Sequence, residues 1–163
     1  MFHIGDKVVH PMHGAGVIDG IVTEKVGPAK QDYYVFKMPV GGLVLKIPVA
    51  TSEIIGLRNI VSAEEANALI EAIATMRVDM TSNWNHRYRE NMERLKSGDL
   101  HSVAVVIKGL TQRDNERGLS NGERKMLHTA KQILVSELVL SMETNSREVE
   151  SRINAAMLGE KAG

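Results

Sequence analysis

The residues best suited to chemistry gather in one short segment around the single tryptophan. Trp84 is followed by His86, Arg87 and Arg89 in a chain of 163 residues. Cationic side chains bind phosphates and release counterions, while a flat apolar ring stacks on bases or wedges between them. This combination is typical of a surface that binds nucleic acid.

The same tryptophan also fits a second interpretation. Its spacing to Tyr88, Met92 and Leu95 places all four side chains on one face of a helix, a pattern that indicates core packing. A side chain in the first turn of a helix can nevertheless extend beyond the packed stripe. Periodicity alone therefore favours a buried Trp84 and leaves the DNA contact open.

A second basic group lies further along the chain. Arg124, His128 and Lys131 have the spacing of one helical face, with Lys125 alongside. From Trp84 to Lys131 there are ten Lys and Arg against six Asp and Glu, although the whole chain has a formal net charge of zero. The cations form either a solvated face or a surface able to straddle a DNA backbone.

The sequence offers no comparable signature of catalysis or of a metal site. It contains no cysteine, and the stretch from Gly14 to Gly16 lacks the Lys-Ser/Thr pair of a phosphate-binding loop. His10 and His13 flank a Pro-Met turn with no carboxylate cluster nearby, so surface histidines are the better interpretation. We expect a protein that is not an enzyme, with no cofactor, no metal and no small-molecule substrate.

The N-terminus and the hydropathy predict where the protein works. Residues 1–6 lack the basic start and apolar block of a signal peptide, and no stretch approaches the ~20 apolar residues of a membrane span. We therefore expect a cytoplasmic protein with no membrane partner.

The elements that must position these residues divide the chain into two parts. The first part is rich in β-branched and aromatic residues and is punctuated by glycine and proline, which predicts about five short strands in a curled sheet or barrel. Turns are expected at 11–14, 27–28 and 41–42. The strands are expected at 7–10, 16–23, 33–38, 43–47 and 54–57.

From Ser62 onward the apolar residues recur at helical intervals. Ser62 with Glu65, and Ser120 with Glu123, have the spacing of a capping box. Five helices are expected: one to about Met76, one from near Ser82 or Asn83 to Ser97-Gly98, one announced by Asp99, a longest one after Ser120, and one over 145–158. The fold class is therefore α+β with two small domains, an N-terminal β domain over 1–58 and an all-helical bundle over 62–163.

Several motifs together resemble the CarD/CdnL family of bacterial RNA-polymerase-binding transcription regulators. The resemblance covers nearly the whole chain. It is carried by residues 8–14 (VVHPMHG), 83–88 (NWNHRY), 95–99 (LKSGD), 113–120 (RDNERGLS) and 130–134 (AKQIL).

The resemblance implies a Tudor-like five-stranded β-barrel that binds the polymerase β subunit and a helical domain that contacts promoter DNA at the upstream edge of the transcription bubble. Contacts of this kind stabilise the open complex without sequence specificity, and they place the protein with the nucleoid. The implied DNA wedge is Trp84. A polymerase-binding adaptor with a buried Trp84 and no DNA contact is the alternative.

The expected site residues follow from the resemblance and from neighbouring side chains. His86 and Lys46 stand where some relatives carry arginine, and Glu24 stands where relatives have a further polymerase-contacting arginine. The expected DNA contacts are Trp84, His86, Arg87, Arg89, Arg124, Lys125 and Lys131. The expected polymerase contacts are Lys25, Leu45, Lys46 and Ile47.

Overall fold

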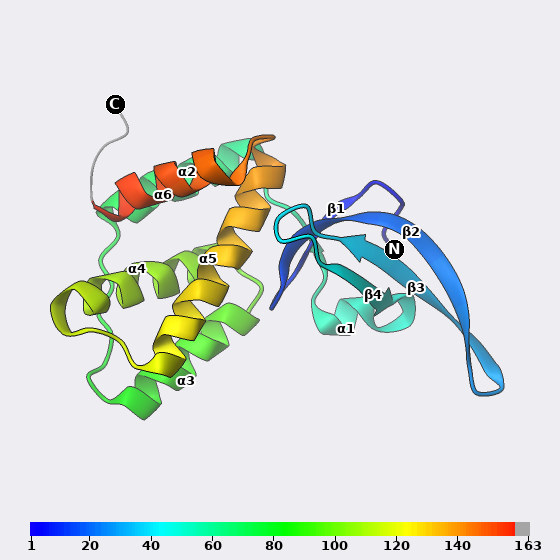
Figure 1. The fold of residues 1–163 in the computed structure, drawn as a ribbon, viewed down its shortest axis with the longest axis horizontal. Helices are drawn as coiled ribbons and strands as arrows, with labels where there is room; N and C mark the ends of the chain where they lie inside the picture. The colour runs from blue at the N-terminus through cyan, green and yellow to red at the C-terminus, as the bar shows by residue number, and fades with distance from the viewer. Residues whose placement is uncertain (159–163) are drawn as a thin grey trace.

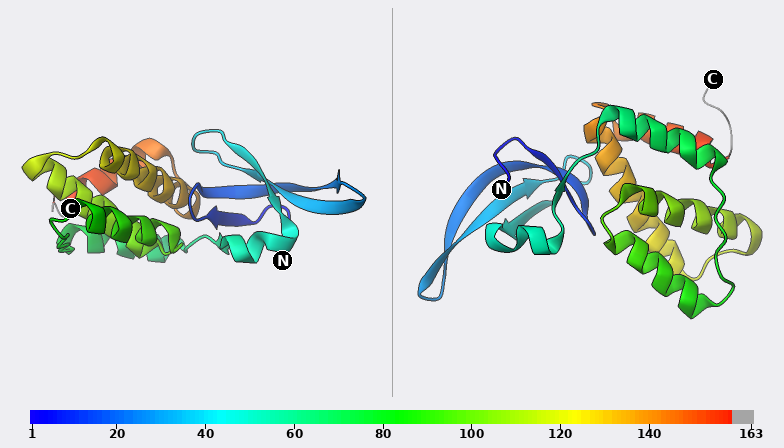
Figure 2. Two further views of the ribbon diagram at one scale, coloured as in Figure 1. Left: turned by 90° about the horizontal axis from the view of Figure 1, so that it is seen from below. Right: turned by 180° about the vertical axis from the view of Figure 1, so that it is seen from behind.

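Five antiparallel strands form the N-terminal part of the protein, as expected from the sequence. The computed structural model describes residues 1–158, and its strands are arranged in the order β4-β3-β2-β1-β5. β2 and β3 form a long hairpin that extends away from the helices (Figure 1, Figure 2). β4 and β5 are the edges, so the structure shows the expected five strands without the β4–β5 pairing that would close them into a barrel. The strands are β1 (Lys7–His10), β2 (Gly14–Val26), β3 (Ala29–Lys37), β4 (Val44–Pro48) and β5 (Arg58–Asn59).

The prediction of a strand at 54–57 is wrong. Residues Ser52–Ile55 form a short helix, α1, which follows a 3₁₀ turn at Val49–Thr51 and ends at Gly56. Gly56 has φ +94°, a left-handed conformation that suits glycine and stops the helix. Ile54 is 86% exposed, so its apolar side chain was not a sign of a buried strand. The fifth strand follows directly, as the two-residue β5.

All five expected helices are confirmed over the described residues. Each begins after a side chain that accepts a hydrogen bond from the backbone N–H three residues later, which satisfies a free N–H of the first turn. These capping residues are Ser62, Asn83, Asp99, Ser120 and Asn145. The helices are α2 (Ala63–Thr75), α3 (Trp84–Lys96), α4 (Leu100–Arg117), α5 (Asn121–Ser141) and α6 (Ser146–Met157). The last residues of the expected helical domain, 159–163, lie outside the described part.

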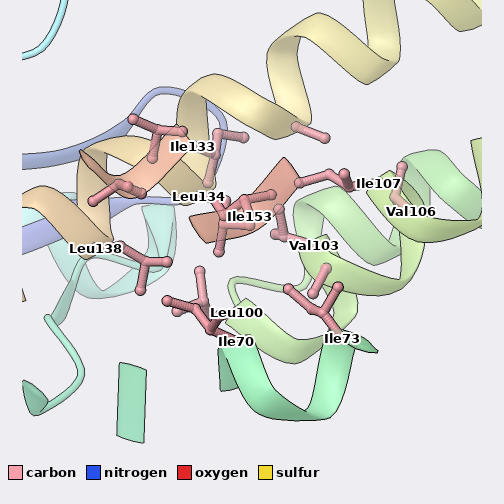
Figure 3. Packing of buried hydrophobic residues seen from close by; sticks show 14 of the residues in the cluster. Ile70, Ile73, Leu100, Val103, Val106, Ile107, Ile133, Leu134, Leu138 and Ile153 are labelled. Carbon is pink, nitrogen blue, oxygen red and sulfur yellow. The ribbon is translucent and has the colours of Figure 1, made fainter. Parts of the chain in front are cut away.

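Each of the two parts has its own hydrophobic cluster. In the sheet, the buried side chains of Tyr34 and Phe36 alternate with outward-facing ones, and Ile47 pairs opposite Tyr34. In the helical part, apolar stripes of α2, α4, α5 and α6 converge (Figure 3). No helix of the described residues is long and apolar enough to cross a membrane.

The sheet and the helices meet along α5. The backbone N–H of Ala15 in β2 donates to Ser136 Oγ at 2.8 Å. A Cβ on Gly14 would collide with the same Ser136 oxygen, so glycine allows β2 to approach the helix this closely. Met12 and Val40 of the β domain also pack on the helical cluster. The two domains therefore share a packed boundary.

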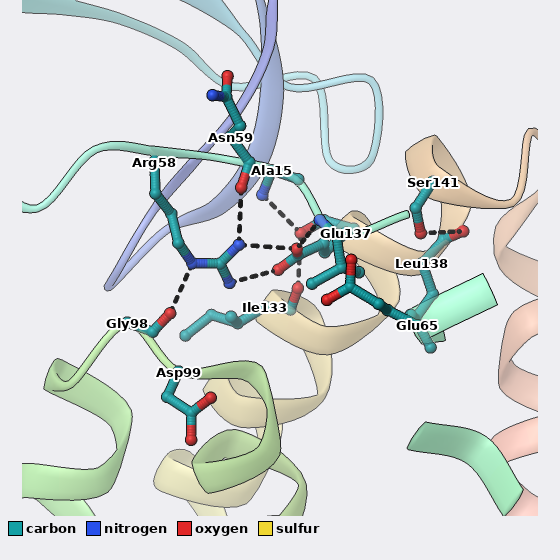
Figure 4. A network of polar contacts seen from close by, with 12 residues as sticks. Ala15, Arg58, Asn59, Glu65, Gly98, Asp99, Ile133, Glu137, Leu138 and Ser141 are labelled. Carbon is teal, nitrogen blue, oxygen red and sulfur yellow. Dashed lines mark hydrogen bonds and ion pairs between the residues drawn. The ribbon is translucent and has the colours of Figure 1, made fainter. Parts of the chain in front are cut away.

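A buried carboxylate on α5 binds β5 and the short linker that follows it. Glu137 on α5 is fully buried and accepts two hydrogen bonds from the Arg58 guanidinium, at 2.9 and 2.8 Å, and a third from the backbone of Val61 at 2.9 Å (Figure 4). Arg58 Nε also donates to the carbonyl of Gly98 at 2.6 Å. One ion pair thus joins the linker, α5 and the turn between α3 and α4.

Candidate nucleic-acid interface

Trp84 is the first residue of α3, and its ring is both packed and accessible. The indole stacks on Tyr88 with ring centroids 5.1 Å apart and an interplanar angle of 22°. Its Nε1 donates a hydrogen bond to Ser120 Oγ at 3.0 Å, next to the start of α5. The residue is 43% exposed. One side of the ring therefore packs as the core interpretation predicted, while much of the residue stays accessible to a ligand.

Arg87 is not on this surface, which corrects the expectation that it contacts DNA. The residue is 1% exposed, and its guanidinium forms a bidentate ion pair with Glu123 at 2.7 and 3.0 Å. Its remaining donor bonds the carbonyls of Thr81 and Ser82. Every nitrogen of the guanidinium is engaged within the protein, so none is free to bind a phosphate.

The partner carboxylate is held in its charged form. Hydrogen bonds from Arg87 lower the pKa of Glu123, an effect that burial opposes and that the charge of Arg87 and a hydrogen bond from Ser120 reinforce. Glu123 is the third residue of α5, where the helix dipole also favours a negative charge. The ion pair is therefore a permanent feature at neutral pH.

The other expected cations are exposed, but they do not all lie together. Arg124 folds back so that its Nε donates to Leu119 O at 3.3 Å, one residue from the hydroxyl that holds Trp84. Lys125 is exposed in the same first turn of α5. His86 and Arg89 are exposed on the side of α3 away from its packed stripe, and His86 Nδ1 lies 3.1 Å from Glu90.

Lys131 lies apart from the tryptophan. It is exposed on α5, about 16 Å further along the helix than Ser120. There it lines a depression with Val40 of the β domain and Glu150 of α6. Of the ten cations between Trp84 and Lys131, Arg87 and Lys108 are buried, so fewer are available to a ligand than the sequence suggests.

The expected polymerase contacts divide in the same way. Lys46 is exposed on the edge strand β4, where it forms an ion pair with Glu24 of β2. Lys25 is exposed near the tip of the β2–β3 hairpin, and Leu45 is half-buried. Ile47 is 3% exposed within the sheet cluster, so a direct contact through this side chain is ruled out in this conformation.

His10 ends β1, and His13 lies in the turn that follows it. Their rings meet edge to face at 4.6 Å, and no group of three ligating side chains lies within residues 1–158. His10 Nδ1 accepts a hydrogen bond from Met12 N at 3.3 Å. Burial, and then the neighbouring His13, lower the pKa of His10, which favours the neutral ring that this bond requires.

Both parts of the chain match known protein families. Residues 2–61 match the family described as "CarD-like/TRCF RID domain", and residues 57–154 match the family described as "CarD, C-terminal domain". The chain belongs to the CarD family. The CarD-family matches overlap at residues 57–61, the linker that Glu137 binds.

A relative from Bacillus subtilis (strain 168), "Putative transcription factor YdeB", is 30% identical over 151 residues. The aligned region covers 93% of this chain and 99% of the relative. With both CarD domains present, the protein is a transcription regulator of the CarD family whose N-terminal domain is of the polymerase-interacting type.

Proposed function

We propose that the β domain binds the β subunit of RNA polymerase while the helical domain contacts promoter DNA at the upstream edge of the bubble and stabilises the open complex. The observation that carries the proposal is the partly exposed Trp84, fixed between the starts of α3 and α5 in a chain with both CarD domains. Such a factor works with the nucleoid in the cytoplasm and needs no cofactor.

The β4 edge supports the polymerase-binding half of the proposal. An edge strand presents unpaired backbone N–H and C=O groups that can pair with a strand of another protein. β4 pairs only with β3 in the described sheet, and it exposes Val44 to 54% together with the Lys46 side chain. Because Glu24 already neutralises Lys46, backbone pairing and apolar contact carry more of this interaction than charge does.

The chemistry of the indole supports DNA binding without sequence preference. Its one N–H is already bonded to Ser120, so the exposed part of the ring offers only apolar contact. Apolar wedges respond to unstacked base steps, and cations such as Arg124 and Lys125 bind phosphates, which are alike at every base pair. Contacts of these two kinds distinguish distorted DNA from regular duplex.

Binding to polymerase explains how so few cations suffice for a contact with DNA. Phosphate contacts dominate the affinity of free DNA-binding proteins, and a chain with a net charge of zero makes few of them. Binding to polymerase raises the local concentration of promoter DNA, so that weak contacts become effective. The packed boundary between the domains, which includes the Arg58–Glu137 pair, holds the helical domain and its Trp84 against the sheet.

A wedge that favours distorted DNA shifts the equilibrium toward the state in which DNA is melted. Unstacking a base step costs a few kcal/mol, so the ring binds best where melting has already met this cost. Differential binding of this kind stabilises the open complex relative to the closed one.

The test compares Trp84→Ala with the unchanged protein on a promoter whose open complex decays measurably. Trp84→Ala is expected to bind polymerase normally and to shorten the open-complex lifetime at saturating protein. Ile54→Ala is the control, because it removes an apolar side chain that is 86% exposed and lies on the other domain. An unchanged lifetime with Trp84→Ala would contradict the proposal.

A further inference from the structure

Four side chains form one connected network beneath the exposed tryptophan. Trp84 Nε1 donates to Ser120 Oγ, and this hydroxyl donates to Glu123 Oε1 at 3.2 Å. The Glu123 carboxylate in turn accepts two hydrogen bonds from Arg87, donated by its Nε and Nη2. The network begins at a tryptophan that is 43% exposed and ends at an arginine that is 1% exposed.

Ser120 holds the ring directly, and Glu123 and Arg87 hold it through Ser120 and the starts of the two helices. Ser120 caps α5 by accepting a hydrogen bond from Glu123 N at 3.2 Å, so the oxygen that holds the indole is itself fixed by the helix. Arg87 binds the carbonyls that precede α3, which sets the start of that helix against α5. A Cβ added to Gly122 of α5 would lie 3.4 Å from the Tyr88 ring and 3.9 Å from the Trp84 ring, so α5 comes close to both.

The arrangement limits what the indole can do. An exposed tryptophan with a free N–H could rotate and donate to a base edge or a phosphate. Here the only polar atom of the ring is satisfied inside the protein, and stacking on Tyr88 fixes the plane of the ring. The exposed portion is therefore held in one orientation and is chemically apolar.

We propose that Ser120, Glu123 and Arg87 are positioning residues that hold Trp84 as a rigid apolar wedge. The claim about orientation stands on the network alone, and the claim about DNA rests on the proposed function. Arg87 thus acts on DNA through Trp84 rather than by touching a phosphate. Rigid presentation matters because an indole that is already ordered loses less rotational freedom when it enters the distorted step.

The single tryptophan makes the first claim measurable in the free protein. Time-resolved fluorescence anisotropy reports the motion of Trp84 alone. Ser120→Ala is expected to add a fast component to the decay, because both the indole bond and the cap are lost. Ser62→Ala is the matched control, since Ser62 caps α2 by accepting from Glu65 N, as Ser120 caps α5 by accepting from Glu123 N, and has no contact with Trp84 among its hydrogen bonds.

Two further variants separate positioning from loss of fold. Ser120→Thr keeps a hydroxyl at the cap and is expected to restore the slow decay. Glu123→Gln keeps the shape of the side chain but weakens the Arg87 bond, and is expected to give an intermediate decay. Slow anisotropy in Ser120→Ala, equal to that of the unchanged protein, would overturn the proposal.

The same variants are then measured in the open complex with polymerase. Ser120→Ala is expected to shorten the lifetime roughly fivefold, the effect of losing one hydrogen bond, while Ser62→Ala leaves it unchanged. If Trp84→Ala shortens the lifetime but Ser120→Ala does not, positioning is refuted and the proposed function survives. If Trp84→Ala has no effect, the proposed function fails, while the anisotropy still decides whether the network holds the ring.

Discussion

Two glutamates of α5 each bind an arginine from another element, and the two ion pairs have different roles. Glu123 near the start of the helix binds Arg87, and Glu137, fourteen residues later and about 21 Å away along the axis, binds Arg58. Both carboxylates are buried and both pairs are bidentate. The first pair lies wholly inside the helical domain, whereas the second joins the helical domain to strand β5 of the sheet.

The burial of the two arginines explains the different consequences that we expect. The Arg87 side chain is 2% exposed, while that of Arg58 is 30% exposed. Removing one partner of a fully buried pair leaves an uncompensated charge away from water. Water can reach the Arg58 pair in part, so its loss is expected to change the relative position of the domains more than the stability of either.

The largest expected effect is the loss of stability in Arg87→Met. The charge of Glu123 is then left buried without a partner, which costs about 3–5 kcal/mol of unfolding free energy. Chemical denaturation of the whole chain measures this value. The double variant Arg87→Met/Glu123→Gln is expected to recover much of the loss, and a loss below about 1 kcal/mol in the single variant would show that the pair is not effectively desolvated.

A smaller effect on stability, with a larger effect on geometry, is expected for Glu137→Gln. The amide keeps an oxygen for Val61 N but loses the charge that binds Arg58. Because the sequence contains no cysteine, two spin labels can be attached at Lys30→Cys and Arg117→Cys, one on each domain. The distance distribution between them should broaden in Glu137→Gln.

Glu143→Gln is the control for this measurement. Glu143 faces Lys7 across the same boundary at 3.8 Å, but its side chain is 82% exposed. Its loss should leave the distribution narrow. Identical narrow distributions in Glu137→Gln and in the unchanged protein would mean that packing along α5 alone sets the domain orientation.

The acid stability of the protein should reveal the Glu123 pair. Because Arg87 lowers the pKa of Glu123 in the folded state, the pair stabilises the protein above the ordinary carboxyl pKa. That contribution is lost as the pH falls through the lowered pKa of the folded state. Unfolding free energy measured from neutral pH to about pH 3 should therefore fall less steeply in Glu123→Gln. An equally steep fall would assign the acid sensitivity to other carboxylates.

The sequence predicted the helices well because their signals are local. Ser62, Asn83, Asp99 and Ser120 are capping side chains that act on the backbone within one turn, and each was found where expected. The strand predicted at 54–57 failed because apolar Ile54 lies on the surface of a short helix. Periodicity reports that a residue is apolar, and not whether another layer covers it.

The candidate site was only partly predictable for a related reason. Trp84 and Arg124 were expected from residue type and resemblance. The structure places Trp84 at the start of α3, bonded to Ser120 at the start of α5, and Arg124 in the first turn of α5. Arg87 was expected to face DNA, yet Glu123, which lies on another helix, draws it into the core. The Ser120–Glu123 spacing was visible as a cap, but nothing local indicates that the same hydroxyl binds an indole 36 residues away.

The smallest expected effect concerns a third ion pair, on the surface of the sheet. The side chains of Lys46 and Glu24 are about half exposed, and exposed pairs contribute less than about 1 kcal/mol. Glu24→Gln should leave the unfolding free energy nearly unchanged while freeing the charge of Lys46. Titration with polymerase should then show altered affinity and a stronger dependence on salt, whereas unaltered binding would place the polymerase contact elsewhere on the domain.

The contact between Trp84 and DNA is tested most directly by photocrosslinking in the assembled complex. A photoreactive phenylalanine analogue is placed at position 84, with the exposed position 54 as a control, and each protein is irradiated with polymerase on an open promoter. The analogue at position 84 is expected to crosslink to DNA at the upstream edge of the bubble, and the one at position 54 is not. Crosslinks from position 84 to polymerase alone would contradict the account.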